Sequence, residues 1–425
     1  MDLLEVMQYP WAQRALLAAC MVGILCGTLG VFIVLRNMAL IGDALAHAIL
    51  PGIVIAFIIA GYSTLAFFIG AVAAGIITAV IITWIQHSSN TKNDAAIGIA
   101  FTAMFALGVI GISRISRSEG VHLDLKDFLF GNILGVSDHD LLLTAFVTVI
   151  SIAAVIIFYR PLFATTFQAT IARTMGISVQ TVHYFLMLLL SFAVVASLRT
   201  VGVILVVAML ITPAATALLL AKRLPVVIIL SAITGLLTAI IGFTVSIWLE
   251  TTPGPAMTVS ATMFYLLALT FAPEKGLLAR SIRKRALKRR IMSEDILKKA
   301  MRSPGHPVGE WLAELNMSSA RMKRYIQLLQ RKGLIKMQNG QWELTDQGRE
   351  KANEIIRAHR LWETYLVRKA GMTEQQIHDD AEAQEHWLPE ELLDEIDEVL
   401  GFPDKDPHGS PIPPKAGVQR DRKEQ

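Results

Sequence analysis

The chain has 425 residues, 53% of them hydrophobic, and a formal net charge of +4 at pH 7. Charge is unevenly distributed: residues 1–272 hold only 11 Lys and Arg and 10 Asp and Glu, whereas residues 273–425 hold 28 and 25. The first part is too apolar for the whole chain to be a single soluble globular domain. The sequence therefore predicts at least two domains, the first in a membrane and the second in water.

Apolar runs long enough to cross a bilayer recur along the whole first part. A membrane-spanning helix needs about 20 such residues, and their recurrence excludes a lone signal peptide. Eight or nine membrane helices are expected, because residues 182–221 are almost uninterrupted. The runs lie near residues 12–35, 40–60, 62–85, 94–114, 139–159, 182–199, 201–221, 225–249 and 257–273.

Basic residues predict the orientation of these helices. Seven of the eleven residues 280–290 are Lys or Arg and follow the last apolar run, which is typical of the cytoplasmic side. This run can also contact anionic lipid. With the N-terminus outside, most other basic loop residues face the cytoplasm, and three fall outside against the trend: Arg114, Arg117 and Lys126.

Two ionisable residues stand inside the second apolar run, MALIGDALAHAILPG at 38–52. Asp43 and His47 are four apart and therefore share a helix face. Ionisable side chains within a membrane are costly and usually functional, and a carboxylate with an imidazole suits Mn(II), Zn(II) or Fe(II). The alternative is a hydrogen-bonded pair that only packs the bundle.

Three further membrane features have both a functional and a plain interpretation. Pro213 interrupts an apolar run, as in the broken helices of transport sites, or it merely kinks a packing helix. Asp94 opens a helix, which capping explains equally well. Residues 160–180 have helical character on the basic side, and are either a short cytoplasmic helix that receives force from a motor subunit or a plain loop.

The soluble part predicts a winged helix–turn–helix followed by a helical domain. Helices are expected at 293–303, 307–315 and 318–332, then a hairpin at 336–344 with an Asn-Gly turn. Further helices are expected at 346–369, near 373–385 and near 389–400, before a tail rich in Pro and charge from 403. The second helix of the motif carries candidate DNA contacts, or else a solvated face. These candidates are Ser318, Ser319, Arg321, Lys323 and Arg324.

Two sets of His and Glu lie behind the winged helix. His359 and Glu363 are four apart, and a second block holds His378, Glu382, Glu385 and His386. Carboxylates with imidazoles suit Mn(II) or Fe(II). One such set alone would usually be a solvated helix face, but the two together favour a regulatory metal site.

The membrane part resembles the permeases of the manganese, zinc and iron ABC importer family over about residues 10–275. The resembling segments are LRNMALIGDALAHAILPG at 35–52, DAAIGI at 94–99 and VAMLITPAATA at 207–217. The resemblance implies a homodimer, a cytoplasmic ATPase on each copy, an extracytoplasmic metal-binding protein, and metal contact by Asp43 and His47. It also implies that residues 162–177 meet the ATPase, in particular Ala172, Arg173, Met175 and Gly176.

Residues 293–413 resemble the iron- and manganese-dependent repressors of the diphtheria-toxin-regulator type. The similarity includes HRLWE at 359–363 and GFPDKDPHGSPIP at 401–413. By position it implies one metal site from Asp295, Glu382, Glu385 and His386, a second involving His359, and ancillary ligands His378 and Glu363. Lys298 departs from the manganese branch, which has an acidic residue there, and its ammonium can form a salt bridge in place of a second metal.

The expected fold is an all-α polytopic membrane bundle with a C-terminal cytoplasmic winged helix–turn–helix and a helical dimerisation domain. The expected boundaries are 1–275 for the permease, 276–292 for a basic linker, 293–402 for the repressor-like domain and 403–425 for the tail. The sequence contains no GxxxxGK[ST], so ATP must bind to another subunit and the chain is not itself an enzyme.

The leading hypothesis is a permease of the bacterial cytoplasmic membrane that imports Mn, Zn or Fe and carries a metal-sensing domain. One alternative is a membrane-tethered, metal-dependent repressor that binds DNA. Another is an exporter, or a permease of the heme or cobalamin type, against which the Asp43–His47 pair argues because it suits a bare ion.

Overall fold

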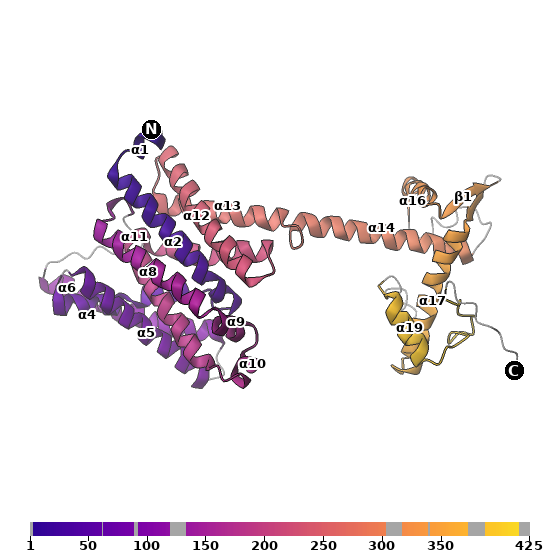
Figure 1. Ribbon diagram of the computed structural model, residues 1–425, viewed down its shortest axis with the longest axis horizontal. Coiled ribbons are helices and arrows are strands. Elements are labelled where there is room, and N and C mark those ends of the chain that lie inside the picture. Colours follow the sequence, from indigo (N-terminus) through magenta and orange to yellow (C-terminus); the bar gives the residue numbers. More distant parts are fainter. Residues whose placement is uncertain are drawn as a thin grey trace. The chain divides into compact units, whose positions relative to one another are not determined.

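The computed structural model describes residues 3–61, 63–88, 92–119, 133–302, 317–338, 341–372 and 387–415. These fall into two compact units, Met1–Arg280 and Ser281–Gln425, coloured along the chain in Figure 1. Three expected features lie outside the described residues, namely the helix at 307–315, the Asn-Gly turn and the helix near 373–385, and so does the end of the expected tail.

The described part of the first unit is helical. Eight of its helices are long and apolar enough to cross a membrane, with α3 and α4 counted as one and the whole of α11 also counted as one. This confirms the predicted polytopic bundle. The helices are α1 (Leu3–Val6), α2 (Pro10–Leu35), α3 (Ile41–Ala48), α4 (Leu50–Ala60), α5 (Thr64–Ser88), α6 (Asn93–Glu119), η1 (Ile133–Gly135), α8 (Asp138–Ile157), α9 (Tyr159–Phe167), α10 (Ala169–Thr174), α11 (Val179–Leu220), α12 (Leu224–Trp248) and α13 (Pro253–Phe271).

Helix α11 turns back on itself at Gly202, where φ is 79° and ψ is 167°. Before the break, Ser197 Oγ lies 3.8 Å from Cys26 Sγ on α2. After it, the Leu210 carbonyl faces Gly30, one turn further along α2. Ser197 and Leu210 would stand about 20 Å apart on a straight helix, so the two halves run in opposite directions. They correspond to the segments predicted at 182–199 and 201–221.

Helix α2 lies at the centre of the bundle and touches α12 backbone to backbone. A Cβ added at Gly23 would stand 2.5 Å from the carbonyl oxygen of Gly235, and one at Gly27 would stand 2.6 Å from that of Ser231. The Ser231 hydroxyl donates to the Gly27 carbonyl at 2.6 Å. Small residues allow such close approach in membranes, where packing rather than the hydrophobic effect holds helices together.

A helix longer than expected begins in the last residues of the first unit and continues into the second. From there on the elements are α14 (Leu277–Arg302), α16 (Ser319–Arg331), β1 (Ile335–Gln338), β2 (Gln341–Leu344), α17 (Asp346–Arg368) and α19 (Glu390–Val399). The basic linker expected at 276–292 and the helix expected at 293–303 are one helix, α14. No Gly or Pro occurs within it, and its Ala, Leu, Lys and Arg residues are strong helix formers.

The winged helix contains the predicted hairpin. β1 pairs antiparallel with β2 in a register that places Ile335 opposite Leu344 and Met337 opposite Trp342. Ile335 and Leu344 are buried with Met322, Ile326 and Leu329 of α16, and α14 contributes Ile296 and Leu297 to the same core.

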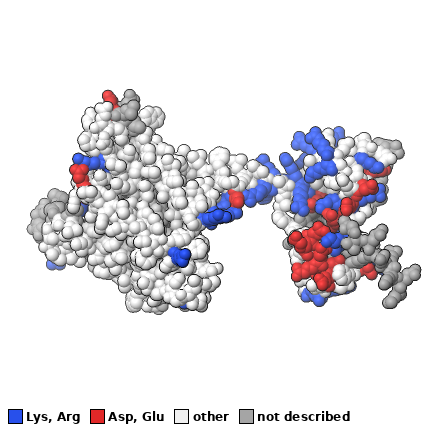
Figure 2. Space-filling model, in the orientation of Figure 1, with Lys and Arg blue, Asp and Glu red and all other residues white. Residues whose placement is uncertain are grey.

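The helices α17 and α19 pack around a second small core formed with residues that follow them. Leu361 is fully buried there with Leu393, Ile396 and Ile412. Figure 2 shows acidic side chains gathered over α19 and basic ones over α16, whereas the face of the membrane unit in view is almost free of charge. The charge on the surface of each unit therefore agrees with the environment that its composition predicts, a membrane for the first and water for the second.

Candidate metal sites and coupling surface

Asp43 and His47 lie together on α3, as their spacing predicts. His47 Nε2 is 3.6 Å from Asp43 Oδ1, and the side chains are 18% and 45% exposed respectively. That distance is longer than an ordinary hydrogen bond. The two groups therefore face one another without closing a tight pair, which weakens the interpretation that they only pack the bundle.

The imidazole of His47 is held by aromatic rings of α6. Its ring centroid lies 5.6 Å from that of Phe101 and 5.4 Å from that of Phe105. Its Nδ1 is buried and has no hydrogen-bond partner among the described residues. Buried polar atoms are normally satisfied. An imidazole that faces a half-exposed carboxylate through Nε2 and leaves Nδ1 unsatisfied is therefore suited to transient contact with a cation.

The second half of α11 lies directly behind these residues. A Cβ at Gly42 would stand 2.7 Å from Leu210 Cδ1, so α3 and α11 approach closely beside Asp43. Pro213, which the sequence singled out, is buried one turn further along α11. Among the described residues, no group of three or more His, Cys, Asp or Glu is placed to hold a metal, and a single copy thus offers a cation two donors here.

Two ion pairs at the start of α8 were not foreseen. Arg199 Nη2 lies 3.3 Å from Asp140 Oδ1, and Arg14 Nε lies 2.8 Å from Asp138 Oδ1. They tie α8 to α11 just before the Gly202 break and to the beginning of α2. The signal that could have found them is an arginine at the end of an apolar run, since such charges are paired and often functional.

The segment expected to meet a motor subunit forms two short helices, α9 and α10. The side chain of Arg36 donates to Thr165 Oγ1 at 2.7 Å and to Thr166 Oγ1 at 3.2 Å, which fixes α9 to the end of α2. Of the four predicted coupling residues, Arg173 and Met175 are exposed and Gly176 ends α10 with a φ of 77°. Ala172 is fully buried, so it packs the segment rather than offering a surface.

In the second unit, α17 brings His359 and Glu363 into contact. His359 Nε2 is 3.1 Å from Glu363 Oε1, and both side chains are 2% exposed. Buried acidic and imidazole donors fit a divalent transition metal. The other predicted ligands on this side, His378, Glu382, Glu385 and His386, lie outside the described residues.

The remaining predicted ligand, Asp295, lies on α14 together with Lys298. Asp295 is partly exposed, whereas Lys298 is buried at 6% exposure. A buried ammonium requires compensating groups nearby. The salt bridge of Lys298 in place of a second metal stays a prediction.

The predicted DNA-contacting residues lie on α16 as expected. Ser318 is its N-cap, although its side chain makes no capping hydrogen bond. Ser319, Arg321, Lys323 and Arg324 are exposed, and Met322 between them is buried. The basic face is therefore free of the winged-helix core.

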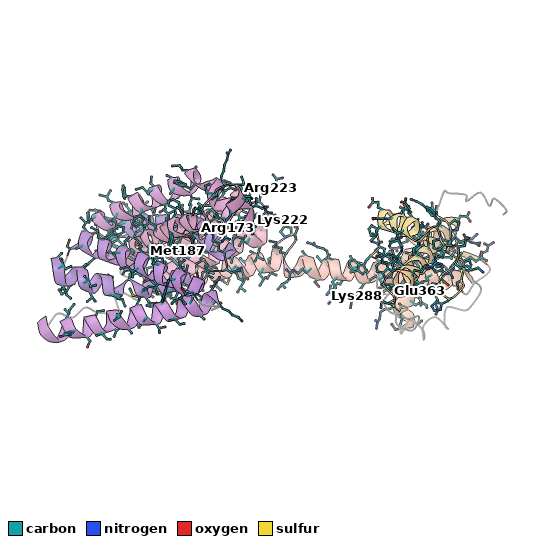
Figure 3. The ribbon with its side chains drawn as sticks, turned by 90° about the horizontal axis from the view of Figure 1, so that it is seen from below. Arg173, Met187, Lys222, Arg223, Lys288 and Glu363 are labelled. Carbon is teal, nitrogen blue, oxygen red and sulfur yellow. The ribbon has the colours of Figure 1, made fainter. Side chains whose placement is uncertain are left out.

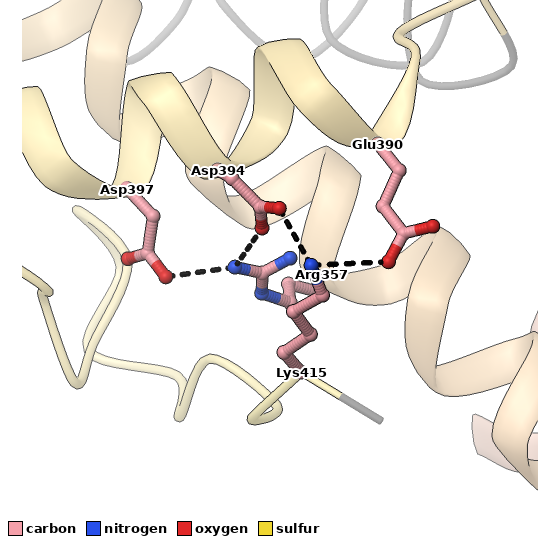
Figure 4. Close-up of polar contacts among 5 residues, drawn as sticks. All are labelled: Arg357, Glu390, Asp394, Asp397 and Lys415. Carbon is pink, nitrogen blue, oxygen red and sulfur yellow. Dashed lines mark hydrogen bonds and ion pairs between the residues drawn. The ribbon is translucent and has the colours of Figure 1, made fainter. Parts of the chain in front are cut away.

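A network of charges connects α17, α19 and the segment that follows (Figure 4). Arg357 Nη2 is 2.8 Å from Asp397 Oδ2 and 3.4 Å from Asp394 Oδ1, and Lys415 Nζ is 2.6 Å from Asp394 Oδ2 and 3.3 Å from Glu390 Oε1. The hydrogen bond from Lys415 lowers the pKa of the Asp394 carboxyl, helped by the charges of Lys415 and Arg357. The same bond raises the pKa of Lys415.

Comparison with known families decides what the membrane unit is. Residues 8–272 match the family described as the ABC 3 transport family. The chain belongs to this family. The soluble part of this ABC 3 protein matches two further descriptions, a winged helix–turn–helix over residues 287–363 and the metal binding and dimerisation domain of iron dependent repressors over residues 345–414.

Several similar proteins are named as membrane subunits of manganese transport systems. The ABC 3 protein is 48% identical over 276 residues to the manganese transport system membrane protein MntC of Halalkalibacterium halodurans, covering 65% of this chain and 92% of the relative. A Bacillus subtilis protein of the same name is 34% identical over 411 residues, 93% of this chain and 92% of the relative. That alignment extends well past residue 272, into the soluble part.

A solved structure shares the membrane fold. PsaBC from Streptococcus pneumoniae, in complex with Fab, matches with a TM-score of 0.57 and 40% identity, covering 64% of this chain and 95% of that chain. With the eight apolar helices, these findings make the protein a multi-pass membrane protein of the ABC permease type fused to a repressor-like domain.

Proposed function

We propose that this ABC 3 family protein is the membrane subunit of a manganese importer and that Asp43 and His47 contact the ion during transport. The observation that carries the proposal is the geometry of that pair, in which a half-exposed carboxylate faces an imidazole with one unsatisfied buried nitrogen. The names of its relatives favour manganese over zinc and iron. A second copy in a homodimer would double the donors to four.

The proposal includes partners. ATP binds to a separate cytoplasmic ATPase that docks on α9 and α10, where Arg173 and Met175 are exposed, and an extracytoplasmic metal-binding protein delivers the ion. The basic run of α14 marks the cytoplasmic side and can contact anionic lipid there.

Uptake of radioactive manganese by cells that express the whole transporter tests this function. Excess unlabelled Mn(II) should compete with the tracer more strongly than Zn(II) or Fe(II). Equal competition by all three would refute manganese selectivity. Uptake that survives alanine at both Asp43 and His47 would instead favour the carriage of a bulky metal chelate.

We further propose that the soluble part senses cytoplasmic metal and restrains transport when metal is plentiful. His359 and Glu363 would contribute to holding the ion, with the predicted ligands Asp295, Glu382, Glu385 and His386. When bound, the metal would supply a positive charge that draws these donors together. Restraint requires that metal favour one transporter state over another.

Calorimetry on the full-length protein tests the sensing site. We expect tight Mn(II) binding that is lost when both Glu385 and His386 are replaced by alanine and retained in the Asp43→Ala variant. If the Glu385 and His386 variant binds Mn(II) as tightly as the original protein, the sensing proposal fails.

A membrane-tethered repressor is the second candidate, favoured by the exposed basic face of α16. It predicts metal-dependent DNA binding that weakens steeply with salt and is lost when Arg321 and Arg324 are replaced by alanine. A gel-shift assay of the full-length protein in detergent, with and without Mn(II), decides it. The absence of any sequence-specific shift at moderate salt would count against DNA binding.

A further inference from the structure

The connection from the last membrane helix to α14 is a short closed turn. Ala272 ends α13, the Gly276 N–H donates to the Ala272 carbonyl at 3.0 Å, and the Arg280 N–H donates to the Gly276 carbonyl at 2.9 Å as α14 begins. A Cβ at Gly276 would stand 2.4 Å from the Ala272 carbonyl oxygen. The turn therefore needs glycine, and its backbone is fixed on both sides.

Two side chains of this turn hold the end of α11. Lys275 Nζ donates to the Leu218 carbonyl at 2.7 Å. That carbonyl is in the last turn of α11, where carbonyls lack helical donors and a positive charge is favourable. Glu274 forms an ion pair with Lys222, labelled in Figure 3 at the turn between α11 and α12. We call Glu274 and Lys275 the linker clamp.

The helix held by the linker clamp reaches the proposed transport site. Leu218 and Leu210 are two turns apart on the second half of α11, after the Gly202 break. The Leu210 side chain fills the space that a Cβ of Gly42 would need, and Gly42 precedes Asp43. A continuous series of contacts thus runs from Lys275 through α11 to the residue next to Asp43.

The other side of the turn continues into α14. This helix runs without a break from Leu277 to Arg302 and carries Asp295, one of the ligands predicted for the regulatory metal. The matched ABC 3 family region ends at residue 272. The linker clamp therefore lies just past the permease, at the start of the helix that enters the soluble part.

We infer that the linker clamp is the coupling element through which metal in the soluble part restrains transport, with Lys275 as the positioning residue for the second half of α11. This inference rests on the proposed feedback. Coupling between two sites requires an element whose equilibrium both sites bias. Here the position of the second half of α11 depends on two contacts. Lys275 contacts its end at Leu218, and α3 contacts it at Leu210.

The test uses the full-length protein with its ATPase subunit in lipid nanodiscs and measures ATP hydrolysis at fixed excess Mg-ATP while MnCl2 is added. We expect Mn(II) to lower the rate of the original complex by at least about fivefold, within the usual range of allosteric coupling. In Lys275→Met the inhibition should disappear, so that the ratio of the rates with and without Mn(II) becomes about one, whatever the rate without Mn(II). Lys284→Met, an exposed lysine of α14, is the matched control and should retain inhibition.

A binding measurement separates coupling from sensing. By calorimetry, Lys275→Met should bind the same amount of Mn(II) per chain as the original protein, so that metal is sensed but not transmitted. Inhibition of Lys275→Met equal to that of the original complex would overturn the inference and leave the feedback standing. An original complex insensitive to Mn(II) would remove the feedback itself.

A second variant covers the case in which Lys275→Met loses ATP hydrolysis altogether. Inserting Gly-Ser-Gly after Gly276 keeps the linker clamp intact and disconnects it from α14. We expect normal hydrolysis without Mn(II) and no inhibition with it. If inhibition survives the insertion, the coupling does not pass through this turn and the inference is wrong.

Discussion

Replacing Arg357 by methionine would remove the cation at the centre of the charge network between α17 and α19. The Arg357 and Asp397 side chains are 7% and 5% exposed and lie 2.8 Å apart. Removing one partner of a buried pair leaves an uncompensated buried charge, which costs about 3–5 kcal/mol. We take the lower end, about 3 kcal/mol, because Asp394 is 39% exposed and keeps its bond to Lys415.

Hydrogen exchange of the full-length protein measures this loss locally. About 3 kcal/mol corresponds to amides of α19 exchanging on the order of 100-fold faster in Arg357→Met. The membrane helices should be unaffected. The double variant with Asp397→Leu should recover much of the protection, because it removes the stranded charge. Exchange in α19 that rises by less than about threefold would refute the claim that this pair stabilises the domain.

Three further outcomes are expected. Asp43→Ala with His47→Ala should lower manganese uptake at least about tenfold, since losing even supporting groups of a metal site costs that much. Gly23→Ala should lower the unfolding temperature in a thermal melt by forcing α2 from α12, whereas Gly98→Ala, with nothing within 4 Å, should not. The folded-state pKa of Asp394 is lowered, chiefly by its hydrogen bond with Lys415, so its charge stabilises the fold above the pKa of an unfolded Asp, about 4, and this stabilisation is lost as the pH falls through the folded pKa. Asp394→Asn should therefore melt earlier than the original protein at pH 7, and the difference in melting temperature should shrink as the pH is lowered.

Much of the fold follows from composition and periodicity. Long apolar runs predicted the membrane helices, but they left open whether residues 182–221 form one helix or two. The break at Gly202 divides this stretch. The winged-helix hairpin followed from turn chemistry and alternation. These signals are local, and they predict structure well because each element must bury its own apolar face.

The features that sequence reasoning missed depend on distant partners. The ion pair of Arg199 with Asp140 joins α11 to α8, and the hydrogen bond from Lys275 to the Leu218 carbonyl joins the linker to α11. Neither has a local pattern. For the candidate site, helical spacing predicted that Asp43 and His47 would meet, but not that rings of α6 would enclose the imidazole.

The first helix of the soluble part begins earlier than predicted, at Leu277 and not at residue 293. From sequence, the basic run is assigned to a linker and no secondary structure is predicted for it. Its seven basic residues form part of one helix, since their long side chains spread into water and the run lacks Gly and Pro.

The backbone contact between α2 and α12 limits how this transporter can change shape. Where Gly23 meets Gly235, no side chain is present that could change rotamer to absorb sliding of one helix over the other. The two helices must therefore move as a rigid pair, and the same holds where Gly30 meets the backbone of Leu210. In the transport cycle proposed above, the second half of α11 is therefore expected to shift relative to α3 together with α2 and α12, and not alone.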